Sequence, residues 1–424
     1  MDWSRPRSAV ASLFLALAVA SPFAYAQQGR PEAKPISADD KAQVLQRVEE
    51  VLSRQAFVPG IDFTKFDEVV AAQKEAIQKA KTEFEFARAV NAAMRQYGFS
   101  HINLFPPDFG TQRTTQKRAG IGITLEIEDK GIRVTNVFED SPAATAGIQT
   151  GDLIVQSDGK PVRERNDLLG DKGSTSNLVV ERGTKKVKVK VTRGDYVPIV
   201  PESLTWDGDV AILKIPTFDV GYNAARVDKL MADADKAKKL VIDLRSNGGG
   251  RVSNLLHLAA HFFDRDSEPL GTFVTKNLVT SYERDNPPTK DVVAIATASK
   301  PNVRAMLSTQ PKFTGKVAVL VNGGTGSASE MLAAALKEIK GAELFGTKTA
   351  GAVLASILTE LPRGKGFWIQ YPLTDYVTIR GVRIEGNGLE PSKTAPDPHY
   401  GEADEPLIDA KHWLASVIRS TSSR

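Results

Sequence analysis

One serine that could act as a nucleophile lies in a glycine-rich segment. Residues 321–330 read Val-Asn-Gly-Gly-Thr-Gly-Ser-Ala-Ser-Glu, after an apolar run and at the start of a helical pattern. Ser327 and Glu330 have capping-box spacing, so one interpretation is that Ser327 only caps a helix. In the other interpretation, the strand-to-helix turn exposes Ser327, and the N–H of Ala328 stabilises an oxyanion. The local pattern leaves both interpretations open.

A second glycine-rich segment favours the catalytic interpretation. Residues 243–250 read Asp-Leu-Arg-Ser-Asn-Gly-Gly-Gly and also follow an apolar strand pattern. Consecutive glycines permit unusual backbone angles and close approach of another group, so this turn could supply a second oxyanion N–H. A tight turn without a ligand is the alternative. Neither segment has the Gly-Lys-Ser/Thr ending of a phosphate-binding loop.

A serine hydroxyl needs an adjacent base to become a good nucleophile. Histidine is the natural candidate because it titrates near neutral pH. His257 and His261 have the i, i+4 spacing of one helix face, and such a pair can bind zinc. No third ligand motif accompanies the pair in the sequence, so we interpret it as structural. His101 follows Ser100 at the end of a helical region and is the best-placed base, with simple packing as the alternative. The histidines of the chain are His101, His257, His261, His399 and His412.

The composition describes a folded protein and excludes several functions. The chain has 424 residues, 41% hydrophobic and 25% charged, which fits two or three globular domains. Its 55 basic and 51 acidic residues are spread along the chain, and no basic block suggests nucleic-acid binding. The chain has no cysteine, which excludes a thiol nucleophile, disulfides and thiolate metal sites.

The N-terminus has the pattern of a cleaved secretory signal. Arg5 and Arg7 precede an apolar run at 9–20, and Ala24-Tyr25-Ala26 gives the small-x-small motif. We expect a signal peptide at 1–26, with an uncleaved anchor as the alternative. No later segment is long and apolar enough to span a membrane. Export to the periplasm of a Gram-negative bacterium is the simplest placement.

The periodicity divides the rest of the chain into three regions. Residues 37–105 are expected to form a helical domain, because apolar residues recur there at helical spacing. Residues 118–193 change to short alternating strands with two short helices. Residues 200–417 alternate buried strands with helices, which predicts a largely parallel sheet with covered faces.

Residues 118–193 resemble a PDZ domain. A PDZ domain adds a peptide as an extra strand and holds the terminal carboxylate with backbone N–H groups. A small β-domain that binds nothing is the alternative. The segments that carry the resemblance are 120–123 (Gly-Ile-Gly-Ile), 141–143 (Ser-Pro-Ala) and 146–154 (Ala-Gly-Ile-Gln-Thr-Gly-Asp-Leu-Ile). The peptide-binding residues that the resemblance implies are Gly120, Ile121, Gly122 and Ile123.

The glycine-rich segments together resemble the C-terminal processing peptidases, also called tail-specific proteases. The PDZ-like region lies upstream of the core, as in that family, and the resemblance covers essentially the whole mature chain. It implies a crotonase-like core of repeated ββα units. It places the nucleophile at Ser327 and oxyanion donors at Ala328 and at Gly249 or its neighbour Gly248. The matching segments are 210–218, 241–250, 321–336 and 344–351.

One element departs from the Ser-Lys members of that family. They carry a general-base lysine in a Gly-Lys-Gly element after Gly-x-x-Thr-x, whereas residues 346–353 here read Gly-Thr-Lys-Thr-Ala-Gly-Ala-Val. The expected lysine position is therefore Ala352, which cannot take a proton. Lys348 is four positions early. We expect Lys348 to be solvated, with too high a pKa to act as a base, although it remains an alternative.

Ser100-His101 instead resembles the Ser-His pair of the tricorn-type relatives. In those, histidine is the base, the preceding serine helps to orient it, and a glutamate completes a tetrad. The resemblance implies Glu385 as this glutamate, with Glu390 as the less favoured choice. A hydroxyl and a carboxylate are suited to fixing the tautomer of an imidazole.

The sequence therefore predicts an α/β protein with a crotonase-like ββα catalytic core, an inserted PDZ domain and a helical N-terminal domain. We expect a serine endopeptidase of exported proteins that recognises the free C-termini of protein or peptide substrates. The predicted chemistry needs neither a metal nor an organic cofactor. A catalytically inactive peptide- or ligand-binding homologue and a PDZ adaptor are the alternatives. The sequence leaves a homo-oligomer open.

Overall fold

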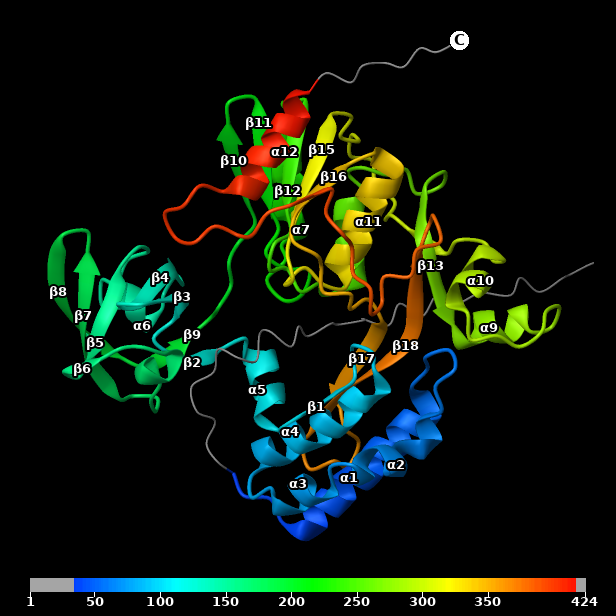
Figure 1. Ribbon diagram of the computed structural model, residues 1–424, viewed down its shortest axis with the longest axis horizontal. Coiled ribbons are helices and arrows are strands. Elements are labelled where there is room, and N and C mark those ends of the chain that lie inside the picture. Colours follow the sequence, from blue (N-terminus) through cyan, green and yellow to red (C-terminus); the bar gives the residue numbers. More distant parts are fainter. Residues whose placement is uncertain (1–33, 417–424) are drawn as a thin grey trace, which may run out of the picture.

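The computed structural model describes residues 34–416 (Figure 1). The expected signal peptide at 1–26 lies outside the described residues. Within 34–416, no helix has both the length and the apolar character needed to cross a membrane. The chain runs from N-terminal helices through a β-rich region into an α/β core (Figure 1).

The N-terminal region is helical, as predicted. Ser37 caps the first helix by accepting a hydrogen bond from Asp40 N, and Val44, Val48 and Leu52 are buried along one face. Residues 66–79 form two short helices and not one, because the backbone leaves the helical conformation at Gln73 (φ −118°, ψ 17°). The elements are α1 (Ala38–Gln55), the 3-10 turn η2 (Phe63–Lys65), α2 (Phe66–Ala71), α3 (Lys74–Lys79), α4 (Glu83–Met94), η3 (Arg95–Tyr97), β1 (Asn103–Phe105) and α5 (Asp108–Thr115).

The middle region is a small, mostly antiparallel β structure. Its main sheet has the order β3-β4-β5-β7-β8, with β6 paired to β5, and a separate pair joins β2 to β9. The apolar side chains of this region form their own buried cluster. The elements are β2 (Arg118–Gly120), β3 (Ile123–Glu128), β4 (Gly131–Val137), α6 (Pro142–Thr145), β5 (Leu153–Ser157), β6 (Lys160–Pro161), η4 (Arg165–Leu168), β7 (Thr175–Arg182), β8 (Lys185–Thr192) and β9 (Gly194–Tyr196).

The core contains the predicted parallel sheet. Its order is β10-β11-β12-β15-β16-β19, and every neighbouring pair except β10-β11 is parallel. The strands are β10 (Ser203–Asp207), β11 (Val210–Lys214), β12 (Lys239–Asp243), β15 (Lys316–Val321), β16 (Glu343–Gly346) and β19 (Lys393–Thr394). The core helices are α7 (Ala224–Ala234), α8 (Val252–Ala259), α9 (Lys276–Tyr282), α10 (Val292–Thr297), α11 (Ala328–Lys340) and α12 (Glu405–Ala415).

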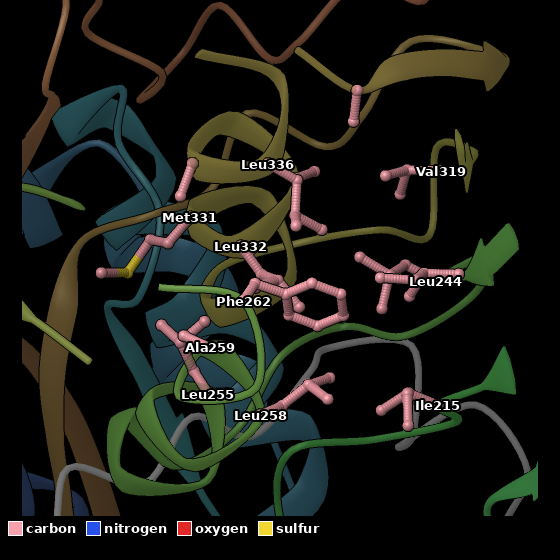
Figure 2. Packing of buried hydrophobic residues seen from close by; sticks show 14 of the residues in the cluster. Ile215, Leu244, Leu255, Leu258, Ala259, Phe262, Val319, Met331, Leu332 and Leu336 are labelled. Carbon is pink, nitrogen blue, oxygen red and sulfur yellow. The ribbon is translucent and has the colours of Figure 1, made fainter. Parts of the chain in front are cut away.

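Both faces of this sheet are covered. Successive side chains of a strand point to opposite faces. On β15, Val319 therefore packs toward α8 and α11, whereas Leu320 packs toward Leu414 of α12. Figure 2 shows Leu258 of α8 and Leu332 of α11 in the first of these layers. This double coverage explains the continuous apolar strands seen in the sequence.

A second, antiparallel sheet ties the N-terminal helices to the core, and sequence periodicity did not reveal it. β1 pairs with β18, with Asn103 opposite Gln370. Leu104 shares a buried cluster with Phe367 and Tyr371. The helical region is thus packed on the core, and the β1–β18 pairing fixes the turn that carries His101. The remaining strands are β13 (Pro269–Thr275), β14 (Val303–Arg304), β17 (Ala355–Glu360) and β18 (Trp368–Thr378).

Candidate active site

Ser327 lies in a strained turn between β15 and α11. Its backbone has φ 56° and ψ −120°, and the residue is 4% exposed. An ordinary N-cap residue is extended, as Ser37 is with φ −78° and ψ 163°. A non-glycine residue with positive φ costs free energy and persists only where its surroundings enforce it, commonly at functional sites. Capping alone therefore does not account for this backbone.

The two glycine-rich segments lie together and are joined by hydrogen bonds. Asn322 Oδ1 accepts from Ser246 N at 2.8 Å, and Gly326 N donates to Asn247 O at 3.0 Å. Thr325 Oγ1 also donates to Leu244 O at 2.9 Å. These contacts hold the turn that carries Ser327 against the 243–250 turn. The two asparagines were not singled out from the sequence, where only their place inside glycine-rich turns pointed to them.

Gly249 lies against Ser327. Its φ is 97°, and a Cβ added to it would lie 2.7 Å from Ser327 Cβ and 3.0 Å from Ala328 N. Only glycine fits such an approach without displacement. The space that a side chain would fill is thus the space beside Ser327 and the first N–H of α11.

Of the N–H groups predicted to bind an oxyanion, that of Gly249 already has a hydrogen-bond acceptor. Gly249 N donates to Asn247 Oδ1 at 3.0 Å, because the asparagine side chain closes its own turn two residues on. That N–H is therefore engaged here rather than directed at an oxyanion. The N–H groups of Ala328 and Gly248 donate to no atom of the described chain.

Ser100, His101 and Glu385 form a hydrogen-bonded chain. Ser100 Oγ lies 2.5 Å from His101 Nδ1 and donates to Glu385 Oε2 at 3.0 Å. Ser100 N also donates to Glu385 Oε1 at 2.7 Å. Because the Ser100 hydroxyl proton is directed to the carboxylate, His101 must supply the proton on Nδ1. The Nε2 atom of His101 is then the unprotonated, accepting nitrogen.

Burial shifts the pKa values of His101 and Glu385. His101 is 9% exposed, and its desolvation lowers the pKa to about 4, so the imidazole is neutral at neutral pH. Burial raises the pKa of Glu385, and the hydrogen bonds from Ser100 and from Val353 N oppose that shift. A neutral imidazole with a free Nε2 has the protonation state that a general base requires.

The segment 349–354 connects the turn that carries Ser327 to the hydrogen-bonded chain of Ser100, His101 and Glu385. On one side, Glu330 Oε2 accepts from Ser327 N at 3.0 Å and from Ala352 N at 2.9 Å. On the other side, Glu385 Oε2 accepts from Val353 N at 2.8 Å and from Leu354 N at 3.3 Å. Consecutive peptide groups therefore bind two buried carboxylates.

The remaining candidates lie as follows. No hydrogen bond within 34–416 joins Ser327 to His101. Lys348 forms an ion pair with Glu390 at 2.7 Å, with side chains 54% and 68% exposed. Lys348 is thus solvated, and Glu385 rather than Glu390 contacts Ser100.

A groove in the middle region contains all four residues predicted to bind a peptide terminus. Gly122 has φ 81°, and a Cβ there would lie 2.3 Å from Ser141 Cβ. The N–H groups of Ile121 and Gly122 donate to no atom of the described chain, whereas Ile121 O accepts from Ala143 N. The groove is lined by Ala119, Gly120, Ile121, Gly122, Ile123, Leu125, Arg165, Leu168, Leu169, Gly170, Arg193 and Tyr196.

Comparison with known families identifies both regions. Residues 209–394 match peptidase family S41, and residues 119–193 match the PDZ domain. The chain therefore has an S41 peptidase domain preceded by a PDZ domain, which confirms the predicted relationship to the processing peptidases. The Ser-His form of the site stays a prediction.

The relatives agree with this assignment. A protein named "Probable CtpA-like serine protease" from Staphylococcus haemolyticus is 28% identical over 288 residues, which is 66% of this chain and 53% of that protein. The chain thus spans about half the length of the curated relatives it matches.

Solved structures agree in fold. A putative S41 protease from Bacteroides fragilis has a TM-score of 0.53 and 18% identity, over 90% of this chain and 97% of that one. The tricorn protease has a TM-score of 0.50 and 17% identity, over 88% of this chain and 37% of that one.

Proposed function

We propose that this protein is a serine endopeptidase in which Ser327 is the nucleophile and His101 the general base. The observation that carries the proposal is the hydrogen-bonded chain from Glu385 through Ser100 to His101, which leaves Nε2 of a buried neutral imidazole unprotonated. The strained turn at Ser327 supports the same assignment.

The proposed reaction uses these residues in two steps, acylation and deacylation. Ser327 Oγ attacks the carbonyl carbon of the scissile peptide while His101 Nε2 takes the hydroxyl proton. The C–N bond then breaks, and His101 returns the proton to the leaving amine, which leaves an acyl-enzyme. A water molecule, deprotonated by the same imidazole, releases the new C-terminus and regenerates Ser327. Ser100 and Glu385 position the imidazole throughout.

The oxyanion would be bound by Ala328 N–H at the positive end of α11. The second donor would be Gly248 N–H, or Gly249 N–H after its peptide releases Asn247 Oδ1. The Ser327–His101 hydrogen bond would form when substrate binds, since catalytic hydrogen bonds are often long in the free enzyme.

The PDZ groove would bind the free C-terminus of a protein substrate. The N–H groups of Ile121 and Gly122, which have no acceptor in the described chain, could donate to a terminal carboxylate. We further propose that the substrates are exported proteins and that the enzyme works in the periplasm. Fractionation of the native host tests the location.

The decisive experiment combines an activity assay with active-site labelling. The wild-type protein should cleave a quenched fluorescent peptide and react with a fluorophosphonate at Ser327. Ser327→Ala and His101→Ala should each lose both reactions. Ser329→Ala is a matched control, because the Ser329 hydroxyl is buried two residues away and has no hydrogen-bond partner.

Each outcome is informative. Cleavage that survives both substitutions would refute the assignment of the two residues. Peptide binding without cleavage by the wild-type protein would favour an inactive homologue or a PDZ adaptor instead.

A further inference from the structure

A second cluster of titratable side chains lies on α7 and α8, outside the proposed active site. His257 and His261 share one face of α8 and the turn after it, and the structure places Asp228 of α7 against both. Asp228 Oδ1 lies 3.2 Å from His257 Nε2 and 2.9 Å from His261 Nε2. The third ligand that the sequence did not reveal therefore comes from the neighbouring helix.

The arrangement has the dimensions of a tetrahedral metal site. One ligand atom from each of the three side chains lies within 4.8 Å of the others. Zinc binds imidazole nitrogen and carboxylate oxygen at about 2.0–2.2 Å, so two ligand atoms of a tetrahedral site are about 3.3–3.5 Å apart. The two distances from Asp228 Oδ1 are within a few tenths of an ångström of that value. Small side-chain rotations are therefore enough to admit an ion.

The surroundings orient His257 and leave one side of the cluster open to solvent. Tyr222 Oη lies 2.9 Å from His257 Nδ1, which directs Nε2 toward Asp228. A hydrogen bond on the second ring nitrogen is the usual support of a metal-binding histidine. The His261 side chain is 5% exposed, whereas those of His257 and Asp228 are 21% and 34% exposed. An ion could enter from solvent and keep a water molecule as its fourth ligand.

We propose that Asp228, His257 and His261 bind a zinc ion that ties α7 to α8. The site is separate from the proposed serine chemistry, which needs no metal. The site is linked to the start of α8 by a chain of contacts. Tyr222, which contacts His257, packs on Phe218 with ring centroids 5.7 Å apart. Phe218 O in turn accepts from Arg251 N and from Asn254 Nδ2 at the start of α8. Zinc would thus stabilise the helix that follows the glycine-rich turn 243–250.

The test is zinc binding by the tag-free mature protein after treatment with EDTA. Calorimetry should give one zinc per chain, and a hundredfold excess of zinc over its Kd should raise the Tm by several degrees. Cobalt bound in place of zinc should give the intense visible absorption of a four-coordinate site. Asp228→Asn and His257→Ala should each weaken zinc binding by at least about tenfold.

His412→Ala is the matched control, because His412 is exposed on α12 and lies outside the cluster. It should bind zinc as the wild-type protein does. His257 is partly exposed, so His257→Ala is expected to fold even if changes at buried His261 are not tolerated. The absence of stoichiometric zinc binding, or unchanged binding in both Asp228→Asn and His257→Ala, would overturn the proposal. The cluster would then be a hydrogen-bonded helix contact only.

Discussion

Replacing Gly249 by alanine should remove activity by crowding Ser327. The new Cβ would lie 2.7 Å from Ser327 Cβ, 2.8 Å from Gly326 O and 3.0 Å from Ala328 N. Two of these atoms belong to the backbone and the third is the Cβ of Ser327, so none can move away cheaply. The substitution therefore tests whether the space beside Ser327 and the first N–H of α11 is the reaction site.

The expected magnitude has two parts. An L residue with φ near 97° costs about 1–2 kcal/mol in backbone conformation. Crowding in a packed site adds about 1–3 kcal/mol. If the Cβ also denies Ala328 N–H to the oxyanion, kcat should fall by about 100- to 1,000-fold.

Gly341→Ala separates the two parts. Gly341 ends α11 with φ 67°, and a Cβ there would have no atom within 4 Å. It should show only the conformational cost and keep wild-type kcat. Urea unfolding followed by tryptophan fluorescence measures the stability of both variants. Trp206, Trp368 and Trp413 all lie outside the PDZ domain, so their signal reports unfolding of the rest of the protein. Wild-type kcat and fluorophosphonate labelling in folded Gly249→Ala would refute the reasoning.

Four further predictions follow from buried ionisable side chains. Glu330→Gln should lower the free energy of unfolding by about 2–4 kcal/mol and suppress fluorophosphonate labelling of Ser327. The reason is that the new amide cannot accept all four hydrogen bonds that the carboxylate now accepts. Urea unfolding measures the first effect, and the labelling reaction measures the second. The folded pKa of His101 is about 4, below its unfolded value of 6.5, so stability from its neutral form should be lost as the pH falls from 6.5 toward 4. For the same reason kcat/KM should have its acid midpoint near 4, and a midpoint near 6.5 would contradict the burial of the base. Arg245→Gln should destabilise α12 by about 3–5 kcal/mol, since Arg245 bridges Asp243 and Asp404, and faster hydrogen exchange confined to α12 would show it.

The sequence predicted those parts of the protein that depend on local pattern. The apolar strands of the parallel sheet and the turn before α11 each follow from neighbouring residues. β18 was not predicted, because Pro372 and several polar residues interrupt its pattern, and its pairing with β1, β13 and β17 defines it. Asp228 was missed for a related reason. A ligand on a different helix leaves no spacing signal beside His257 and His261.

In the candidate site, too, the sequence predicted features that depend on local pattern and missed those that depend on tertiary contacts. Ser327 and the 243–250 turn could be found from glycine spacing, since a close approach requires particular residue types in both turns. The engagement of Gly249 N by Asn247 could not, because it depends on which way one peptide group faces. The contact of Glu385 with Ser100 joins residues 285 positions apart, and only the family resemblance pointed to it.

In the mechanism we propose, the base comes from another element because alanine occupies position 352. Its side chain cannot take a proton, yet the segment around it remains anchored, because Ala352 N binds Glu330 and the next two peptide groups bind Glu385. Glu385 is thereby fixed from one side by this segment and reaches Ser100 from the other. The β1–β18 pairing is what brings Ser100 and His101 to that carboxylate. The Ser-His site we propose therefore depends on the N-terminal region being packed on the core, so loss of that packing should remove the base while leaving the nucleophile turn folded.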